Sequence, residues 1–148
     1  LEIVGDDVPN GSFTAHQAAL FDWSQHPDLQ YVSSLGVYET SVHLEYILPD
    51  ARYFLDLGDL FAAAQVTVNG HDVGHTIFAP YQIDVTDSLH PGENAIRLEV
   101  TPPLRNRLLG KAIQGDPEYA QFAAPGRFGP AKPIPSGLAG PVRLQIRA

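Results

Sequence analysis

The stretch YFLDLGDLFAAAQVTVNGHDVGHTIFAPYQIDVTDSLHPGENAIRLEV, residues 53–100, decides the fold class of this 148-residue chain. It contains four runs in which apolar and polar residues alternate, separated by clusters of turn-forming residues. The apolar members of these runs are Tyr53, Leu55 and Leu57, then Ala64, Val66 and Val68, then Ile83 and Val85, then Ile96, Leu98 and Val100. A period of two at such short spacing is typical of half-buried strands in an antiparallel sandwich or barrel.

Further strands and turns follow from the residues inside and around this stretch. Asn69-Gly70 lies between two alternating runs and predicts a hairpin with a type I′ turn. Residues 90–94 predict a second hairpin turn, and residues 142–146 alternate clearly enough to predict a last strand. Tyr31 to Leu44 and Ser12 to Thr14 predict two earlier strands. The chain is therefore expected to be all-β, an antiparallel β-sandwich with the jelly-roll arrangement of about eight strands.

Length and composition predict a single domain over residues 1–148, because a chain of this size can bury one core. Residues 1–20 form an N-terminal lead-in with few regular signals. Residues 102–140 are expected to be a long ordered loop rich in Pro and Gly, with one or two helical turns in residues 104–114. The loop is expected to be ordered because it retains Tyr119, Phe122 and Phe128.

Several classes of protein are excluded by composition. The chain has no Cys, which rules out disulfides and thiolate metal sites, and its net charge of -8 argues against nucleic acid as a partner. No apolar run is long enough to cross a membrane. The chain has no Met and no signal peptide, so we expect a mature product or an excised domain. The absence of Cys suits a periplasmic or secreted bacterial protein.

The charges are unevenly placed along the chain. Residues 1–96 hold 14 acidic residues and one basic residue, Arg52, whereas residues 97–148 hold 8 basic and 3 acidic residues. The favoured interpretation is that the basic C-terminal part folds back over the acidic body. The other interpretation is a basic edge that docks on a larger acidic partner.

No catalytic constellation is recognisable in the sequence. It has no nucleophile elbow and no phosphate-binding loop, and Glu39 and Glu45 do not lie in a run that gathers several acids on one concave face. His71 and His75 flank a hairpin instead of lying on a helix, so their spacing does not predict a metal site. No cofactor is expected. A weak calcium candidate consists of Asp6, Asp7 and Asn10, for which an ordinary turn is the favoured interpretation.

Six residues are candidates for carbohydrate binding because sugars are held by aromatic platforms and planar polar groups. They are Trp23, His26, His75, Tyr81, Asn106 and Arg107. A structural interpretation stands beside each functional one. Trp23 is either a stacking platform or, as favoured, a plug of the core. Arg107 either binds sugar hydroxyls or forms a salt bridge to the acidic body. Asn106 is expected to satisfy backbone groups, and Tyr81 to pack.

The chain resembles the sugar-binding β-sandwich domain of family 2 glycoside hydrolases. The motifs that carry this resemblance are Gly36–Tyr38, LDLG (55–58), AQVTVNGHDVG (64–74), APYQIDVT (79–86) and PGEN (91–94). Three further stretches resemble the C-terminal domain of large bacterial α-L-rhamnosidases of family 106. These are DWSQHPDLQYVSSLGVY (22–38), LRNRLLGKAIQGDPEYAQF (104–122) and PSGLAGPVRL (135–144). The resemblance covers nearly all of the chain from about Phe21.

This resemblance implies a galactose-binding-like jelly roll attached to a catalytic module that lies outside the chain. A catalytic barrel needs about 250 residues, so none fits here. Three hypotheses remain open. The chain is a non-catalytic carbohydrate-binding accessory domain whose parent is an α-L-rhamnosidase, or a sandwich that braces the parent's catalytic domain without binding sugar. A free-standing enzyme is the least favoured. The expected partners are accordingly a carbohydrate or the parent's catalytic domain.

Overall fold

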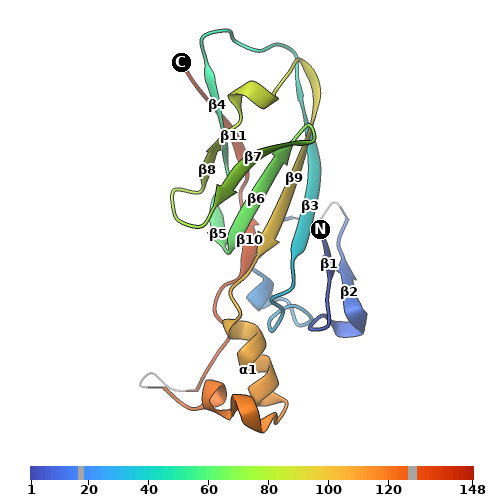
Figure 1. Ribbon diagram of the computed structural model, residues 1–148, viewed down its shortest axis with the longest axis vertical. Coiled ribbons are helices and arrows are strands. Elements are labelled where there is room, and N and C mark those ends of the chain that lie inside the picture. The colour runs from blue at the N-terminus through green and yellow to red at the C-terminus, as the bar shows by residue number, and fades with distance from the viewer. Residues whose placement is uncertain (17–18, 127–129) are drawn as a thin grey trace.

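The computed structural model describes residues 1–16, 19–126 and 130–148, and two layers of antiparallel strands dominate it (Figure 1). The larger layer is a six-stranded sheet in the order β2-β1-β3-β9-β6-β7. Its strands are β1 (Glu2–Val4), β2 (Ser12–Thr14), β3 (Gly36–Leu44), β6 (Ala63–Val68), β7 (His71–Thr76) and β9 (Gly92–Thr101). The long pair β3 and β9 forms its centre, in register from Gly36 opposite Val100 to Leu44 opposite Gly92.

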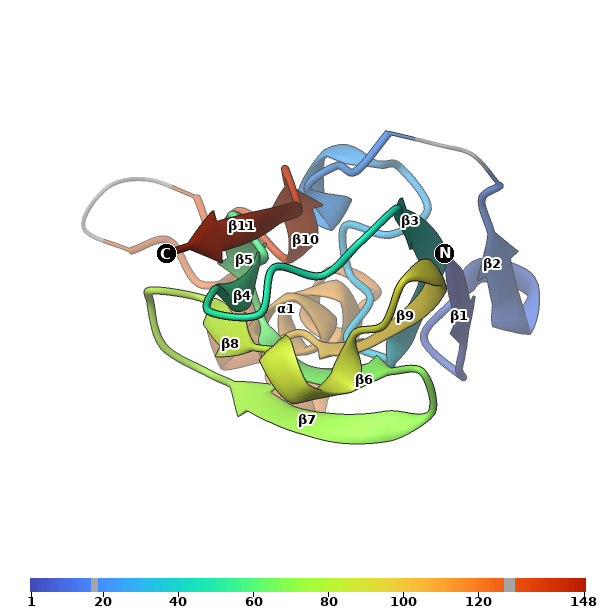
Figure 2. The same ribbon diagram turned by 90° about the horizontal axis from the view of Figure 1, so that it is seen from above.

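The second layer consists of two short sheets. One has the order β11-β4-β8 and the other pairs β10 with β5. Their strands are β4 (Arg52–Asp56), β5 (Asp59–Phe61), β8 (Gln82–Asp84), β10 (Gly137–Gly140) and β11 (Arg143–Arg147). Figure 2, seen from above, places β7 and β11 on opposite sides of the molecule. This arrangement confirms the expected all-β sandwich of the galactose-binding-like type.

The main core lies between the layers and contains the apolar residues of the alternating runs. The members buried there include Tyr53, Leu55, Leu57, Ala64, Val66, Val68, Ile83, Val85, Ile96, Leu98 and Val100. Each of these side chains removes apolar surface from water, at about 25 cal/mol per Å². The alternation in residues 53–100 therefore reports correctly which side of each strand faces the core.

The hairpin between β6 and β7 confirms the type I′ prediction. Asn69 and Gly70 both have positive φ, 51° and 80°, as the two central residues of this turn require. The Asn69 amide also bonds to the neighbouring loop, donating to the Ser88 carbonyl and to the Asn94 side chain at 2.8 Å each. The turn is thus held by both backbone preference and side-chain contacts.

The second predicted hairpin, at residues 90–94, is wrong as a hairpin. A turn is present there, where the buried Asn94 side chain bonds to the backbone of His90 in both directions. However, β8 pairs with β4 in the second layer, and the 3-10 turn η3 (Thr86–Ser88) separates β8 from β9. The chain therefore crosses between layers at this point, which local alternation does not reveal.

The segment 102–140 is more regular than the expected loop. It contains the helix α1 (Arg105–Ile113), the 3-10 helix η4 (Pro117–Ala123) and β10. Figure 1 shows α1 and η4 together below the sandwich. Phe128 lies outside the described residues. Within the described part of the chain, no helix is long and apolar enough to span a membrane.

The N-terminal segment builds a second, smaller core. Ser12 to Thr14 forms β2 as predicted, whereas β1 was not foreseen; the two strands pair, and β1 also pairs with the start of β3. The 3-10 turns η1 (Pro9–Gly11) and η2 (Trp23–Gln25) complete this region. Its buried residues are Ile3, Val8, Trp23, Leu29 and Val32. The start of the predicted strand 31–44 does not form a strand, and β3 begins only at Gly36.

Candidate functional site

Trp23 belongs to the core and is not a sugar platform. Its side chain is 0% exposed, and its indole N–H donates to the Tyr38 hydroxyl at 2.8 Å. Gly36 and Gly137 lie directly against the ring, since a Cβ on either would come within about 2.5 Å of ring atoms. The functional interpretation of Trp23 is therefore wrong, and the favoured interpretation as a core plug is confirmed.

Asn106 and Tyr81 also have structural positions. Asn106 is 1% exposed, and its amide exchanges two hydrogen bonds with the Ile134 backbone, donating at 2.7 Å and accepting at 2.9 Å. These bonds tie α1 to the segment before β10 and satisfy backbone groups, as expected. Tyr81 is half-buried against the main core. A sugar therefore has no access to the Asn106 amide.

The two candidate histidines lie in different places. His26 packs its ring against Phe13 and Phe21, with centroid distances of 5.1 and 5.6 Å, and its Nδ1 accepts from the Asp28 amide at 3.2 Å. His75 is exposed on β7, beside a shallow hollow of about 210 Å³ on the outer face of the larger sheet. The structure thus does not bring these two histidines together in one site.

Arg107 contacts Asp6 and Asp7, which the sequence suggests as part of a separate calcium site. Its guanidinium donates to the Asp6 carboxylate at 2.9 Å and lies 3.6 Å from the Asp7 carboxylate. Asp7 also accepts from the Ser33 backbone N–H at 2.7 Å and from the hydroxyls of Ser33 and Ser34. The expected salt bridge between Arg107 and the acidic body is present. It joins α1 to the N-terminal segment across 101 residues.

The proposed calcium ligands therefore have partners from within the chain. Asp6 and Asp7 share the Arg107 guanidinium, and Asn10 adopts a left-handed backbone conformation in η1. Among the described residues, no three His, Cys, Asp or Glu side chains gather as a metal site would require. A bound calcium ion stays a prediction with no geometric support from these residues.

A pocket of about 290 Å³ opens beside this ion pair. It is lined by Asp6, Asp7, Val8, Pro9, Tyr31, Arg107, Gly110, Lys111 and Gln114. Gly110 lets α1 approach closely, because a Cβ there would lie 2.7 Å from the Cβ of Tyr31. Two acidic and two basic side chains line the pocket, so their formal charges cancel. The pocket, termed here the Arg107 pocket, offers hydrogen-bond donors and acceptors without favouring a charged ligand.

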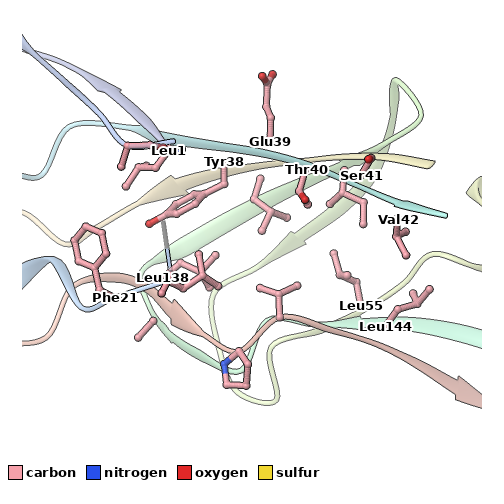
Figure 3. A pocket seen from close by; sticks show the side chains of 18 residues that line it. Leu1, Phe21, Tyr38, Glu39, Thr40, Ser41, Val42, Leu55, Leu138 and Leu144 are labelled. Atoms are coloured by element: carbon pink, nitrogen blue, oxygen red, sulfur yellow. Dashed lines mark hydrogen bonds between the residues drawn. The ribbon is translucent and has the colours of Figure 1, made fainter. Parts of the chain in front are cut away.

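A larger cleft of about 760 Å³ lies between β3 and the β10–β11 segment (Figure 3). Its lining residues are Leu1, Ala15, Ala19, Leu20, Phe21, Tyr38, Glu39, Thr40, Ser41, Val42, Leu55, Ile96, Leu98, Leu138, Ala139, Pro141, Val142 and Leu144. In Figure 3 the Tyr38 ring and Thr40 point into the cleft, whereas Glu39 points away. The lining is mostly apolar, which suits another polypeptide segment better than a polyhydroxyl ligand.

Tyr38 at the inner end of the cleft is held in its protonated form. Burial raises the pKa of its hydroxyl to about 12, although hydrogen bonds from the Trp23 indole and the Leu138 backbone partly oppose this shift. The hydroxyl therefore remains neutral at physiological pH and serves as a hydrogen-bond acceptor inside the fold. This role is structural and gives the cleft no general base.

With the geometry described, the class of domain follows from comparison with known proteins. Residues 17–128 match the family described as glycosyl hydrolase 2 galactose-binding domain-like. The chain belongs to this family, which accounts for both the sandwich and the VNG hairpin motif. It is thus a β-sandwich domain of the kind found in glycoside hydrolases, and the resemblance drawn from the sequence is confirmed.

Individual relatives are large glycosidases. A rhamnosidase structure from Novosphingobium sp. PP1Y aligns over 98% of this chain and 14% of its own, with a TM-score of 0.71 and 31% identity. A putative beta-glucuronidase from Formosa agariphila is 33% identical over 95 residues, which cover 62% of this chain and 8% of that protein. A beta-galactosidase from Clostridium acetobutylicum is 30% identical over 89 residues, 55% of this chain and 10% of that protein. The chain thus spans only a small part of the length of these relatives.

Proposed function

We propose that this chain is a non-catalytic accessory domain of a larger glycoside hydrolase, and that it binds carbohydrate in the Arg107 pocket. The alignment of nearly the whole chain with a small part of a rhamnosidase supports an α-L-rhamnosidase as the parent. The observation that carries the binding role is the charge-neutral, hydrogen-bonding pocket around the ion pair between Arg107 and Asp6.

The chemistry of the pocket suits a neutral sugar. Each sugar hydroxyl both donates and accepts, so adjacent hydroxyls pair naturally with a carboxylate beside a guanidinium. The Asp6 side chain is 79% exposed and therefore retains accepting capacity beyond its bond to Arg107. Tyr31 adds an aromatic wall against which the CH face of a sugar packs. The volume lies near the lower end of small-molecule sites, about 300 to 1,000 Å³, and thus suits one or two sugar units.

The hydrogen bonds of Asp7 support a non-catalytic role for this pocket. Glycoside hydrolysis requires one carboxylic acid that protonates the leaving group and a second carboxylate on the other side of the bond. Asp7 has a side chain that is only 7% exposed, and it accepts hydrogen bonds from Ser33 and Ser34. Donors from within the chain thus occupy both oxygens of this carboxylate, which leaves neither free to act on a glycosidic bond.

The binding role is tested by calorimetric titration of the chain with L-rhamnose, D-galactose and D-glucuronate. We expect millimolar affinity for at least one neutral sugar and about tenfold weaker binding, equivalent to ~1.4 kcal/mol, in Asp6→Asn and Arg107→Gln. Glu39→Gln is the matched control because it breaks a comparable exposed ion pair, with Arg97, on the outer face of the larger sheet. Equal affinities in all variants would exclude this pocket. Hydrolysis of an aryl rhamnoside by the chain alone would contradict the non-catalytic assignment.

A second candidate function is that the domain braces the other modules of the parent. The specific observation that favours it is the cleft beside β3, whose apolar lining stays accessible in this chain. Contiguous apolar surface of this kind marks an interaction site in a soluble protein. Bracing and sugar binding use different regions of the fold, so the two functions are compatible.

A further inference from the structure

β3 has a free edge along most of its length. Its first residues, Gly36 and Val37, pair with Ile3 and Glu2 of β1. From residue 38 to residue 44, the described residues provide β3 with a strand partner only on the β9 side. Alternate residues of this stretch therefore point unpaired backbone N–H and C=O groups away from β9, where another extended segment would find a template for pairing.

This free edge forms one wall of the cleft. Five consecutive residues of β3, from Tyr38 to Val42, line it. Successive side chains of a strand point to opposite faces, so a cleft that touched only one face would be lined by alternate residues. Lining by consecutive residues means that the cleft faces the backbone edge itself.

The inner face of the sandwich is also incompletely covered at this edge. Thr40 lies opposite Ile96 in the register of β3 and β9, so both side chains point toward the interior. Ile96 is 6% exposed, whereas Thr40 is exposed to solvent. Figure 3 shows Thr40 directed into the cleft. The second layer therefore ends before it covers the inward-facing side chain of Thr40 on β3.

The opposite wall is apolar and belongs to the C-terminal strands. Its residues are Leu138, Ala139, Pro141, Val142 and Leu144, with Leu55 at the floor. In the strand order of its sheet, β11 is also an edge strand. However, β11 contributes only Leu144 to the cleft lining, so its face rather than its edge lies toward the cleft. β3 is accordingly the edge available for pairing.

We propose that an extended segment of the parent polypeptide, from outside residues 1–148, pairs with residues 38–44 of β3 and fills the cleft. This inference rests on the accessory-domain function proposed above. The free edge determines that the occupant is a strand, since its backbone groups need partners at strand spacing. The apolar walls determine that its inward residues are apolar and alternate with polar ones. The parent supplies it because the similar rhamnosidase has most of its length outside the aligned region.

The proposal can be tested by thiol labelling. Because the chain has no Cys, a single introduced thiol is the only one in these 148 residues that a maleimide labels. Thr40→Cys places a thiol in the cleft, and the neighbouring Glu39→Cys places one on the outer face as the matched control. Each variant is labelled with a maleimide, both in the full-length parent and in the 148-residue chain. Labelling is followed by mass spectrometry of the peptide that contains the thiol. We expect Cys labelling at position 40 to be at least about tenfold slower in the parent, and labelling at position 39 to be nearly unchanged.

Hydrogen exchange identifies the form of the covering segment without any substitution. We expect the amides of residues 38–44 that point away from β9 to exchange more slowly in the parent than in the chain, because a paired strand protects them. Equal labelling at position 40 in the two proteins would overturn the proposal. So would slow labelling without amide protection, because the cover would then not be a paired strand. Protection that appears in the 148-residue chain only as its concentration rises would assign the edge to a second copy and would also overturn it.

These outcomes are separable from the proposed function. Sugar binding is measured on the 148-residue chain, where the cleft is open, whereas strand pairing is measured on the parent. If the chain binds no sugar but the thiol at position 40 is protected in the parent, the binding role fails and the pairing proposal stands. If the parent hydrolyses no glycoside, its proposed glycosidase activity is refuted. The labelling result still tests whether a strand of the parent pairs with β3.

Discussion

The indole N–H of Trp23 donates a 2.8 Å hydrogen bond to the hydroxyl of Tyr38, and this bond joins the two cores of the sandwich. Trp23 is a member of the N-terminal core, and Tyr38 packs against both that core and the main one. The N-terminal segment is thus connected to the central sheet by polar as well as apolar contacts. Stability of the two regions is therefore expected to be coupled.

The coupling between these residues is measurable by a double-mutant cycle. Trp23→Phe and Tyr38→Phe each remove one partner of a buried hydrogen bond, so each is expected to lower the free energy of unfolding by about 1 to 3 kcal/mol. The double variant is expected to lose about 1 kcal/mol less than the sum, because the bond is lost only once. Urea denaturation gives all three values. Tyr46→Phe, at a side chain 66% exposed, is the control and is expected to change stability by less than about 0.5 kcal/mol. Strict additivity would contradict the coupling.

The raised pKa of Tyr38, about 12, predicts a loss of stability in alkali. The unfolded chain releases this proton near pH 10, whereas the folded protein retains it until about pH 12. Stability due to this group is therefore complete below pH 10 and falls by about 3 kcal/mol in total as pH rises from 10 past 12. Denaturation midpoints across this range provide the measurement. Tyr38→Phe should flatten the decline, whereas Tyr46→Phe should leave it unchanged; an equally steep decline in Tyr38→Phe would refute the assignment.

The lowered pKa of Asp84 predicts a loss of stability in acid. Its pKa is lowered from 3.8 to about 2, first by the hydrogen bond from the Thr86 hydroxyl, then by the Thr86 backbone N–H, with a further contribution from Arg52. Stability due to this carboxylate is therefore present above pH 3.8 and is lost as pH falls toward 2. Asp84→Asn is expected to cost about 1 kcal/mol at pH 7, since its side chain is partly exposed.

The measurement for Asp84 is the free energy of unfolding from pH 7 to pH 2. The difference between the wild-type protein and Asp84→Asn should shrink as pH falls below 4. Asp87→Asn is the control, because Asp87 is an exposed acidic residue in η3 of the same loop. A constant difference across the whole range would show that Asp84 contributes through packing rather than charge.

The close packing of Gly110 against Tyr31 predicts that the position of α1 affects the Arg107 pocket. A Cβ at this position would lie 2.7 Å from the Cβ of Tyr31, so Gly110→Ala must displace α1 from that wall. We expect a loss of about 1 to 3 kcal/mol despite the higher helix propensity of Ala, together with weaker sugar binding. Gly126→Ala is the control, because nothing lies within 4 Å of a Cβ there. Unchanged stability and sugar affinity in Gly110→Ala would contradict this packing.

Much of the sandwich was predictable because its strands carry local signals. The alternation in β6 and β9 follows directly from one buried and one exposed face, and Asn69-Gly70 has the backbone preferences that its turn requires. The site was less predictable. The sequence indicates Arg107 as a candidate, but it indicates its partner Asp6 only as part of an ordinary turn or a weak calcium site. A separation of 101 residues leaves no local trace of such a pair.

The sequence by itself determined the strand class, the hairpin at Asn69-Gly70 and the family, because each depends on short-range patterns along the chain. Only the tertiary structure decided whether Trp23 is buried or exposed, and what shape the cleft has. Trp23 is buried because Gly137, 114 residues later, has no side chain where the indole lies. The cleft exists because the layer opposite β3 ends before it covers Thr40. Both depend on which segments meet in space, and residue spacing carries no information on that.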